Sequence, residues 1–419
     1  MTIWHPTDNS HADITSHDTF TNGVPHNTFA RLRTEDPIHW TEYKDGIGFW
    51  SITRHEDISL MIGNTETFTS EYGIRMEDQS YEEYLARRTF QEIDGMEHRN
   101  LRMKVAKAFS GPVIREFEYS IRDLCSKILD DVFVDSKFDA VEKIARELPM
   151  KMLGRIIGLP EEDLPWLVEK GDALIANTDP DFTDHVLDKL DTDKFRMMPH
   201  NSPAGADLYQ YAEDLMKKKK QSGDTNGILS MIVEPNEDGS RISEIEFKNF
   251  FCQLVAAGND TTRYSIAAGI HALCHQPELL AQMQHDSKIW DTAPDEIIRW
   301  ASPVNYFRRT ARNDFEIHNK IIKSGDKVLY WFASSNRDVK KFDNPFKVDL
   351  YRKPNSHQAF GQGGPHICLG IWLARLEIKC LFQEFSKRVS KITQTDNHEF
   401  LRSNFVNGIK KLPVNIKLQ

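Results

Sequence analysis

The stretch Phe360-Gly361-Gln362-Gly363-Gly364-Pro365-His366-Ile367-Cys368-Leu369-Gly370 lies near the carboxyl end of the chain. It places one cysteine in a glycine-rich loop, directly ahead of a segment with a helical pattern at residues 371–385. Glycines let the backbone approach a large flat ligand and adopt dihedral angles that other residues avoid. Amide groups at the start of the following helix favour a sulfur anion. The arrangement therefore suits a thiolate that binds a metal ion.

A single cysteine is more often a small buried apolar side chain than a metal ligand, so Cys368 alone does not decide between these alternatives. The flanking residues favour the ligand, because the eleven residues closely resemble the haem-binding loop of the cytochrome P450 family. In that family the cysteine is the proximal iron ligand. The resemblance implies haem b (iron protoporphyrin IX) as the cofactor, Cys368 as the metal ligand, and Phe360 and Gly361 as cofactor-binding residues.

The composition favours one large folded unit. The chain has 419 residues, of which 39% are hydrophobic and 28% charged, so it can bury a large core. A length-based prior suggests roughly two or three domains, but no Pro/Gly/Ser-rich linker, repeat or low-complexity tract divides the sequence. We expect a single domain over residues 1–419, with residues 1–20 as a loosely ordered tail.

Charge, cysteine usage and hydropathy argue against several classes of protein. The net charge of −10 gives no support for nucleic-acid binding. The five cysteines are far apart and form no CxxC pair, which argues against a disulfide framework or a zinc site and fits a reducing cytoplasm. No apolar stretch reaches the roughly 18 residues that a membrane span needs. We therefore expect a soluble, cytoplasmic protein without a membrane span.

The spacing of apolar and turn-forming residues predicts a mainly α-helical protein with a small β region. Runs rich in β-branched or aromatic residues, bounded by turn formers, predict strands at residues 37–41, 48–53, 315–318 and 327–332. Helical patterns cover residues 97–110, 113–134, 140–157, 161–177 and 207–220. The resemblance implies the cytochrome P450 fold, in which haem lies between a long distal helix and the proximal cysteine loop.

The longest predicted helix has well-marked ends. Ser243 and Glu246 form a capping box, and Ile242 and Phe247 supply a hydrophobic staple across it. Apolar or small residues then recur at helical spacing until Pro277 ends the pattern. A helix of about thirty residues is roughly 45 Å long. Such a helix would cross a whole domain, so we expect its middle to be buried.

The middle of this helix carries an unusual run, Ala256-Ala257-Gly258-Asn259-Asp260-Thr261-Thr262-Arg263. Glycine costs a helix interior about 1 kcal/mol, and a threonine can bond back to a carbonyl one turn earlier and open a local bulge. One interpretation is a buried hydroxyl that satisfies itself, with Asp260 on a solvent face. The resemblance instead implies the oxygen-binding groove of the distal helix. Gly258 would then leave room for dioxygen beside the haem, and Thr261 and Asp260 would be catalytic, Thr261 by hydrogen-bonding the reacting oxygen and Asp260 by delivering protons from solvent.

Glu296 and Arg299 lie three residues apart on one predicted helix. Taken alone, such a pair is usually a surface feature that stabilises a helix by a few tenths of a kcal/mol. The P450 family has a buried ExxR pair that braces the fold beneath the haem and is joined by an arginine from a later loop. By that resemblance Glu296 and Arg299 are structural, and residues 336–338 and 342–345 resemble the later region.

Several basic residues resemble the partners of the haem propionates. His98 and Arg102 lie four residues apart at the start of a predicted helix, where the alternative is an exposed charged turn. By resemblance they bind the propionates together with Arg309 and His366, a contact for which the planar guanidinium of arginine is well suited. The choice between Arg309 and the adjacent Arg308 stays open, and His357 is a weaker candidate.

The spacing of the cysteine loop indicates a subgroup. Phe360 and Cys368 are eight positions apart, one more than in the commonest bacterial pattern of the family. This longer loop, the run at residues 258–263 and the run at residues 299–303 together resemble a subgroup of bacterial hydroxylases. Its members attack sterol side chains, branched lipids and alkanes at or near a chain end. We expect a haem-thiolate monooxygenase that uses O2, a hydrophobic substrate, and electrons from a separate ferredoxin and ferredoxin reductase.

Other functions remain open on the sequence alone. They are a peroxide-using relative, a haem-binding sensor or carrier without turnover, and a tailoring hydroxylase of a terpene or other secondary metabolite. The pairing of Asp260 with Thr261 favours monooxygenation, because proton delivery at a reacting oxygen needs an acid and a hydroxyl. We expect substrate contacts from Val255, Ala256, Val304, Tyr306 and Phe307. Candidate cations for ferredoxin docking are Arg99, Lys104, Lys107, Arg375 and Lys379.

Overall fold

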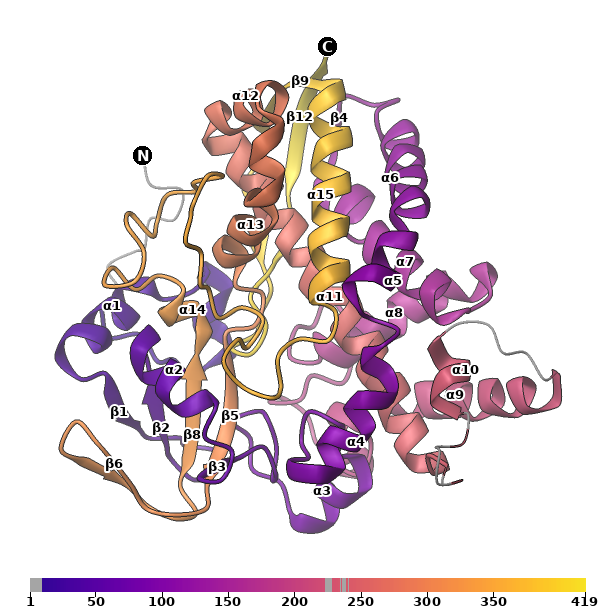
Figure 1. The fold of residues 1–419 in the computed structure, drawn as a ribbon. Helices are drawn as coiled ribbons and strands as arrows, with labels where there is room; N and C mark the ends of the chain where they lie inside the picture. The colour runs from indigo at the N-terminus through magenta and orange to yellow at the C-terminus, as the bar shows by residue number, and fades with distance from the viewer. Residues whose placement is uncertain (1–9, 223–227, 234, 236–238, 240) are drawn as a thin grey trace.

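The computed structural model describes residues 10–222, 228–233, 235, 239 and 241–419. Helices make up most of it, and a five-stranded sheet lies at the lower left of Figure 1. One large hydrophobic core contains buried side chains from Ile14 to Ile416. The arrangement confirms the expectation of a mainly α-helical protein with a small β region.

The α-helices surround a long central helix, α11 (Glu244–His275). The others in the described chain are α1 (His26–Glu35), α2 (His55–Ile62), α3 (Tyr81–Arg87), α4 (Gly95–Ala106), α5 (Gly111–Glu116), α6 (Glu118–Val132), α7 (Glu147–Ile157), α8 (Leu164–Ile175), α9 (Pro203–Ser222), α10 (Ile228–Val233), α12 (Pro277–His285), α13 (Ala293–Ala301), α14 (Phe332–Ser335) and α15 (Ile371–Arg388). Short 3-10 or π turns are η1 (His17–Asn22), η2 (Val141–Ala145), η3 (Glu161–Asp163), η4 (Asp193–Phe195), η5 (Pro199–Asn201) and η6 (Ser287–Asp291).

The ends of α11 confirm the predicted capping signals. The Ser243 hydroxyl accepts a hydrogen bond from the amide of Glu246 at 3.3 Å, and the Glu246 carboxylate accepts one from the amide of Ser243 at 2.8 Å. Pro277 begins the next helix, α12, rather than extending α11. Helices α7, α8, α9 and α13 pack against α11, so most of its residues are buried.

The main sheet joins distant parts of the chain in the order β1-β2-β8-β5-β3. Its strands are β1 (Ile38–Thr41), β2 (Phe49–Ile52), β3 (Phe68–Thr69), β5 (Tyr306–Ala311) and β8 (Lys327–Trp331). Strands β2 and β8 run parallel, and the other neighbours are antiparallel. The pairing of Arg309 with Val328 sets the register between β5 and β8. This sheet holds β5 beside the candidate site.

Smaller sheets use the remaining strands. They are β4 (Lys137–Asp139), β9 (Val389–Gln394) and β12 (Pro413–Leu418) in one sheet, β10 (Glu399–Phe400) with β11 (Ile409–Lys411), and β6 (Phe315–Ile317) with β7 (Lys320–Ile322). Figure 1 shows β9 and β12 behind α15 at the top of the molecule. The predicted strands correspond to β1, β2, β6 and β8. Strand β5 and the C-terminal strands were not predicted, because their sequences lack a clear alternation between turn formers.

The predicted helical stretches are all present, although the structure divides some of them. Residues 113–134 form α5 and α6, which meet at Phe117. Residues 140–157 begin with the π turn η2 before α7, and residues 161–177 begin with the 3-10 turn η3 before α8. These breaks depend on local hydrogen bonds that an apolar periodicity does not report.

The expectation of a loosely ordered tail over residues 1–20 is wrong for residues 10–20. Ile14 and Phe20 are buried in the main core, and the carboxylate of Asp18 accepts a hydrogen bond from Arg402 at 2.5 Å. The physical reason is that this polar stretch carries two apolar anchors. Residues 1–9 lie outside the described part of the chain.

Candidate active site

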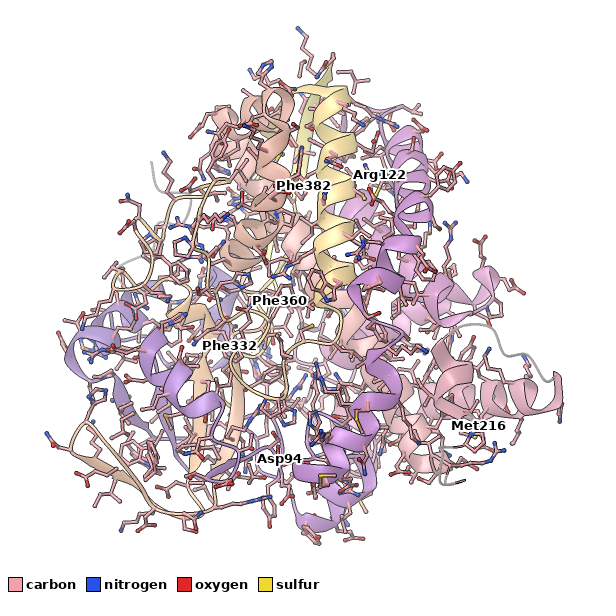
Figure 2. All side chains as sticks on the ribbon, in the orientation of Figure 1. Asp94, Arg122, Met216, Phe332, Phe360 and Phe382 are labelled. Carbon is pink, nitrogen blue, oxygen red and sulfur yellow. The ribbon has the colours of Figure 1, made fainter. Side chains whose placement is uncertain are left out.

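The glycine-rich loop turns sharply before α15 begins at Ile371. Gly361 and Gly363 have positive φ angles of 64° and 103°, a conformation that side chains other than glycine disfavour. A Cβ atom on Gly364 would lie 2.5 Å from the carbonyl oxygen of Ile62, so the loop packs against the end of α2 only because this residue is glycine. The amide of Cys368 donates to the carbonyl oxygen of Phe360 at 2.9 Å. Figure 2 shows Phe360 near the centre of the view, in this loop.

The thiol of Cys368 faces a cavity. The side chain has exposed surface although it lies deep in the molecule, since the surface borders an internal space rather than bulk solvent. Burial raises the pKa of Cys368, while the amide of Gly370 and the charges of Arg102 and Arg375 lower it. The backbone amide and the two guanidinium groups thus support a sulfur anion, and a bound metal ion would complete that support.

The cavity, together with the solvent-open space at its mouth, contains about 1230 Å³ of atom-free space. One wall is α11, and another is the cysteine loop with the first turns of α15. Apolar side chains dominate the remaining walls; they include Phe90, Phe109, Leu153, Ile298, Val304, Phe307 and Leu373. A large, mostly apolar cavity with a thiol on one wall fits a flat macrocyclic cofactor together with an apolar ligand.

Helix α11 turns one face toward the cavity. Leu254, Ala257, Gly258, Thr261 and Ser265 line it, and their spacing of three or four residues is that of one helix face. A Cβ atom on Gly258 would lie 2.7 Å from Cδ2 of Leu153. Glycine at this position therefore lets α7 pack closely against α11 as well as leaving space at the cavity.

The expected substrate contacts are partly wrong. Val304 and Phe307 line the cavity, but Val255 and Ala256 lie on another face of α11 and are almost completely buried by neighbouring helices. Tyr306 is also fully buried, and its hydroxyl accepts a hydrogen bond from the amide of Met76 at 3.3 Å. The correction follows from geometry, since residues adjacent in a helix or strand point in different directions.

Thr261 makes the hydrogen bond that its sequence context predicts. Its hydroxyl donates to the carbonyl oxygen of Ala257, one turn earlier, at 2.8 Å. The α-helix nevertheless continues without interruption from Glu244 to His275, so the predicted bulge is absent from this described helix. The hydroxyl oxygen borders the cavity and keeps its lone pairs available to a donor.

Asp260 lies behind Thr261 and away from the cavity. It is 1% exposed, so the interpretation that places it on a solvent face is wrong. Its carboxylate accepts a hydrogen bond from Arg263, and the other carboxylate oxygen, Oδ2, has no hydrogen-bond partner among the described residues. Burial raises the pKa of Asp260 to about 7, although the charge of Arg263 opposes the shift. Both protonation states are therefore accessible near neutral pH.

A chain of charged groups connects Asp260, through Asp172 on α8, to Arg146 at the start of α7. Arg263 also contacts Asp172 at 2.8 Å, and Asp172 accepts from Asn259 at 2.7 Å and from Arg146 at 2.7 Å. The side chain of Arg146 is 35% exposed. The network therefore runs from the buried helix α11 to solvent through charged side chains.

The predicted propionate partners come together beside the loop. The rings of His98 and His366 lie 4.2 Å apart, and Arg102 donates to the carbonyl oxygen of Ile367 at 2.6 Å. His366 Nε2 lies 2.7 Å from the carboxylate of Asp94, which Figure 2 labels below Phe360. Arg309 lies close enough to influence the pKa values of His98 and His366. Four basic side chains thus gather beside the loop, and the carboxylate of Asp94 contacts one of them, His366.

This cluster has unmet capacity for an anion. Burial lowers the pKa of His98 to about 4, with further lowering by the charges of His366 and Arg102, and its Nε2 atom has no partner among the described residues. In the described chain the buried guanidinium of Arg309 donates only to the carbonyl oxygen of Arg308, at 2.7 Å, without an ion pair. Buried cations without acidic partners are costly. The residues therefore fit a cofactor that brings its own carboxylates, as the haem propionates would.

The structure separates the alternative propionate candidates. Arg308 points to the other face of β5, where it donates to the carbonyl oxygen of Glu77 at 3.0 Å and lies 3.7 Å from Asp78. His357 is fully buried and bonds to Asp295 at 3.1 Å, away from the cavity lining. The geometry therefore favours Arg309 over Arg308 and does not bring His357 into the cluster.

Glu296 and Arg299 form a buried brace, as the resemblance implied. Both side chains are fully buried, and the guanidinium meets the carboxylate through two hydrogen bonds of 2.7 and 2.8 Å. The arginine that joins them is Arg352, at 3.0 Å from Glu296. Arg337, in the region expected to supply it, instead donates to the carbonyl oxygens of Arg299 and Trp300. That expectation is corrected, because the chain beyond residue 345 folds back over α13.

Some site residues were not identified from the sequence. Asp94 holds His366, and Glu377 on α15 lines the cavity with one carboxylate oxygen, Oε1, unpartnered among the described residues. Burial raises the pKa of Glu377 well above its usual range. No local pattern marks either carboxylate. Only their positions could have indicated them: Asp94 is four residues before His98, and Glu377 is nine residues after Cys368.

A thiol on a cysteine loop that faces a long helix across a cavity, with a cluster of basic side chains beside it, fits a haem-thiolate protein. The match to the family model for cytochrome P450 extends over residues 19–416. The chain belongs to the cytochrome P450 family, and its enzyme class is accordingly a monooxygenase with haem b as cofactor. Helices long and apolar enough to span a membrane are not found in the described part of the chain.

Similar proteins include lipid and steroid hydroxylases. A methyl-branched lipid omega-hydroxylase of Mycobacterium tuberculosis is 34% identical over 398 residues, which are 92% of this chain and 90% of that protein. A steroid C26-monooxygenase of Rhodococcus jostii is 30% identical over 416 residues, which are 97% of this chain and 84% of that protein. A Mycobacterium marinum cytochrome P450 solved in complex with pseudoionone is 32% identical, with a TM-score of 0.87 over 98% of this chain and 99% of that one.

Proposed function

We propose that this monooxygenase hydroxylates an aliphatic C–H bond at or near the end of a long hydrophobic substrate, such as a branched lipid, sterol side chain, alkane or fatty acid. The observation that carries the proposal is the apolar cavity that brings Thr261 of α11 and Cys368 into one space. The names of the lipid and steroid hydroxylases that resemble the chain support the substrate class.

The cofactor-binding residues come from the cysteine loop, from α4 and from β5. Cys368 would hold the haem iron through its thiolate, and His98, Arg102, Arg309 and His366 would hold the propionates. When bound, haem supplies the iron that activates dioxygen, with a thiolate that increases electron density at the metal. The Gly370 amide, which hydrogen-bonds the sulfur, tunes that thiolate. Phe360 and Gly361 shape the turn that presents it.

Thr261 and Asp260 take part in proton transfer to the cavity. The Thr261 hydroxyl is held by its bond to Ala257, so its oxygen is oriented to accept a hydrogen bond from a group in the cavity. Asp260 has a pKa of about 7 because it is buried, so it can gain and lose a proton near neutral pH. A rotation of Asp260 away from Arg263 would carry a proton from the network of Arg263, Asp172 and Arg146 toward Thr261.

The cavity walls account for terminal selectivity. A terminal methyl has a stronger C–H bond than the internal methylenes, so the protein must hold the chain end close to the reacting centre and keep the rest away. Leu254, Val304 and Phe307 supply apolar surfaces from two directions. They exclude water and guide an extended chain rather than a wide polar molecule.

The electron donor is a small acidic ferredoxin with its reductase. Arg99 within α4 and Lys107 directly after it are exposed, and Lys104 is half-buried between them. Arg375 forms an ion pair with Asp295 at 2.9 Å, so it contributes less free positive charge than the sequence suggested. Local positive charge steers an acidic partner even on a chain of net charge −10.

We also propose that the described chain is a single domain acting in the cytoplasm. The main core combines side chains from both ends of the chain, and the five cysteines are free thiols, as suits a reducing compartment.

The experiment that tests the function is a binding and product screen of the haem-loaded enzyme. Fatty acids, alkanes, branched isoprenoids and sterols are titrated by the optical spin-state shift, and binders are turned over with ferredoxin and reductase. We expect products oxidised at or next to the chain end. In-chain oxidation of every lipid, together with efficient turnover of a polyketide or small aromatic compound, would refute the proposal.

A further inference from the structure

A second, polar cavity lies beside the apolar one. It contains about 640 Å³ of atom-free space and is lined by the segment around residues 73–92, by parts of residues 187–201, and by Gln253 of α11. Most of the residues that line it carry an arginine, carboxylate or amide side chain, in contrast to the residues that line the apolar cavity at Cys368. The two cavities therefore offer different chemistry to one molecule.

The two cavities share a boundary. Gln253 lines both of them. In the segment at residues 89–92, Thr89 and Glu92 border the polar cavity, while Phe90 and Gln91 border the apolar one. A substrate chain in the apolar cavity thus has the polar cavity as its neighbour at the Gln253 end.

Two arginines face the polar cavity without acidic partners. Arg75 donates to the amide oxygen of Asn177 at 3.3 Å and lies over the ring of Phe405 at 4.5 Å. Arg87 donates twice to the amide oxygen of Gln79, at 3.2 and 2.9 Å. Within the described chain neither guanidinium forms an ion pair, and the Nε atom of Arg75 is buried without a partner.

Neighbouring cations are paired, so the two arginines differ from their surroundings. Arg88 contacts Glu97 at 2.7 Å, and Lys327 contacts Asp78, an acid at the edge of the polar cavity, at 2.9 Å. The pairing with Lys327 removes Asp78 as a partner for either arginine.

The remaining carboxylates of the lining, Glu77 and Glu92, form no ion pair with either arginine in the described chain, since both arginines donate to amide oxygens instead. The carboxylate of Glu92 accepts hydrogen bonds from the amide and the hydroxyl of Thr89, at 2.9 and 3.3 Å. Glu77 keeps one buried oxygen without a partner. Both guanidinium groups thus face the cavity without an ion pair in the described chain, and each keeps N–H groups available to an added carboxylate.

We infer that the polar cavity binds the carboxylate of a long-chain acid through Arg75 and Arg87, while the far end of the chain enters the apolar cavity at Cys368. The inference rests on the proposed terminal hydroxylation and names the substrate within that class. A carboxylate accepts paired hydrogen bonds from guanidinium groups, a stronger contact than a neutral hydroxyl or ester makes. An extended acid held at one end presents its other end to the reacting centre.

The test compares ligands that differ only at the polar end. Hexadecanoic acid, its methyl ester and hexadecan-1-ol are titrated into the haem-loaded enzyme by the optical spin-state shift. We expect the acid to bind at least about tenfold more tightly than the ester or the alcohol, a difference on the scale of one charge-assisted contact. Arg75→Gln and Arg87→Gln should each weaken acid binding by about tenfold and leave ester binding almost unchanged.

Two further variants serve as controls. Arg88→Gln changes the adjacent arginine, which is paired with Glu97 and does not line the cavity, and should leave the Kd for the acid unchanged. Arg75→Lys keeps the charge and should retain part of the preference for the acid. Equal affinity for acid, ester and alcohol in the wild type would overturn the inference. So would an equal loss of acid and ester binding in Arg75→Gln and Arg87→Gln, or no binding of the acid.

The products separate this inference from the proposed function. If the acid binds selectively through Arg75 and Arg87 but is oxidised within the chain, the carboxylate site stands and terminal hydroxylation fails. If the alcohol, the ester and the acid bind equally and all are oxidised at the chain end, the proposed function stands and the carboxylate site fails.

Discussion

The carboxylate of Asp260 accepts a hydrogen bond from the guanidinium of Arg263, three residues later on α11, and both side chains are buried. The same guanidinium contacts Asp172 on α8. One arginine therefore lies between two acids, and its contact with Asp172 leads outward to Arg146 at the surface. The pair gives Asp260 a route to solvent that does not pass through the substrate cavity.

Asp260→Asn should slow product formation about tenfold or more, because the amide cannot carry a proton. Burial raises the pKa of Asp260 to about 7, so the fraction that holds a proton falls as the pH rises through about 7. The wild-type rate should fall over the same range, and Asp260→Asn should lose that dependence and show a changed solvent isotope effect. A pH profile and isotope effect identical to those of the wild type would point to another proton route.

Thr261→Ala should keep haem and substrate binding while most of the consumed oxygen is released as hydrogen peroxide. The reason is that the cavity loses the hydroxyl that Ala257 orients. The ratio of product to oxygen consumed, measured with a peroxide assay, checks this outcome. Thr261→Ser retains the hydroxyl and serves as the control. Full coupling in Thr261→Ala would remove the proposed role.

Cys368→Ser should lose the strongly red-shifted Soret band of the ferrous carbon monoxide complex, because a hydroxyl does not replace the thiolate. Cys274→Ser is a suitable control, since Cys274 lies on α11 and does not line the cavity. The optical spectrum of both reduced variants under carbon monoxide decides the point. Persistence of the band in Cys368→Ser would disprove the ligand assignment.

Glu296→Ala should give poorly folded protein with little haem. The substitution removes the carboxylate that both Arg299 and Arg352 contact, and breaking a buried ion pair from one side costs about 3–5 kcal/mol. Haem content per chain and thermal unfolding would show the loss. Glu278→Ala, on the first turn of α12 and outside the cavity lining, should have little effect on either. Normal folding and haem loading of Glu296→Ala would contradict the structural role.

Charge reversal at Lys104 and Lys107 should slow reduction by ferredoxin, and the wild-type rate should fall as salt is added, because salt screens the attraction between the two proteins. Stopped-flow reduction rates at several ionic strengths measure both effects. Lys417→Glu, on β12, reverses a comparable charge outside the candidate docking face and should leave the rate unchanged. If the reduction rate changes neither with salt nor with charge reversal at Lys104 and Lys107, this surface is not the docking site.

Local sequence signals predicted several features correctly. The capping box at Ser243 and Glu246 determines where α11 begins, because both hydrogen bonds form within one turn. The glycines of the cysteine loop likewise indicate its turn, since positive φ angles at Gly361 and Gly363 are set by neighbouring residues. Interactions within a few residues can be read from a pattern without the rest of the fold.

Periodicity could have improved the predicted substrate contacts. Leu254 lies seven residues, close to two helical turns, before Thr261 and shares its face, whereas Val255 and Ala256 do not. The alternation of a strand likewise places Phe307 and Arg309 on one face of β5, opposite Tyr306 and Arg308. The placement of Phe307 and Arg309 on one face could be made only once β5 was known, and the sequence did not indicate this strand.

The sequence by itself determined the cysteine loop, the long helix that faces it and the ExxR pair. Only the tertiary structure decided that Arg352 completes the brace, that Asp172 and Arg146 connect Asp260 to the surface, and that Arg75 and Arg87 lack acidic partners in the described chain. Each of these facts depends on segments far apart in the sequence. Their packing is set by how whole helices and strands bury their apolar faces together, and no local pattern of residues specifies that arrangement.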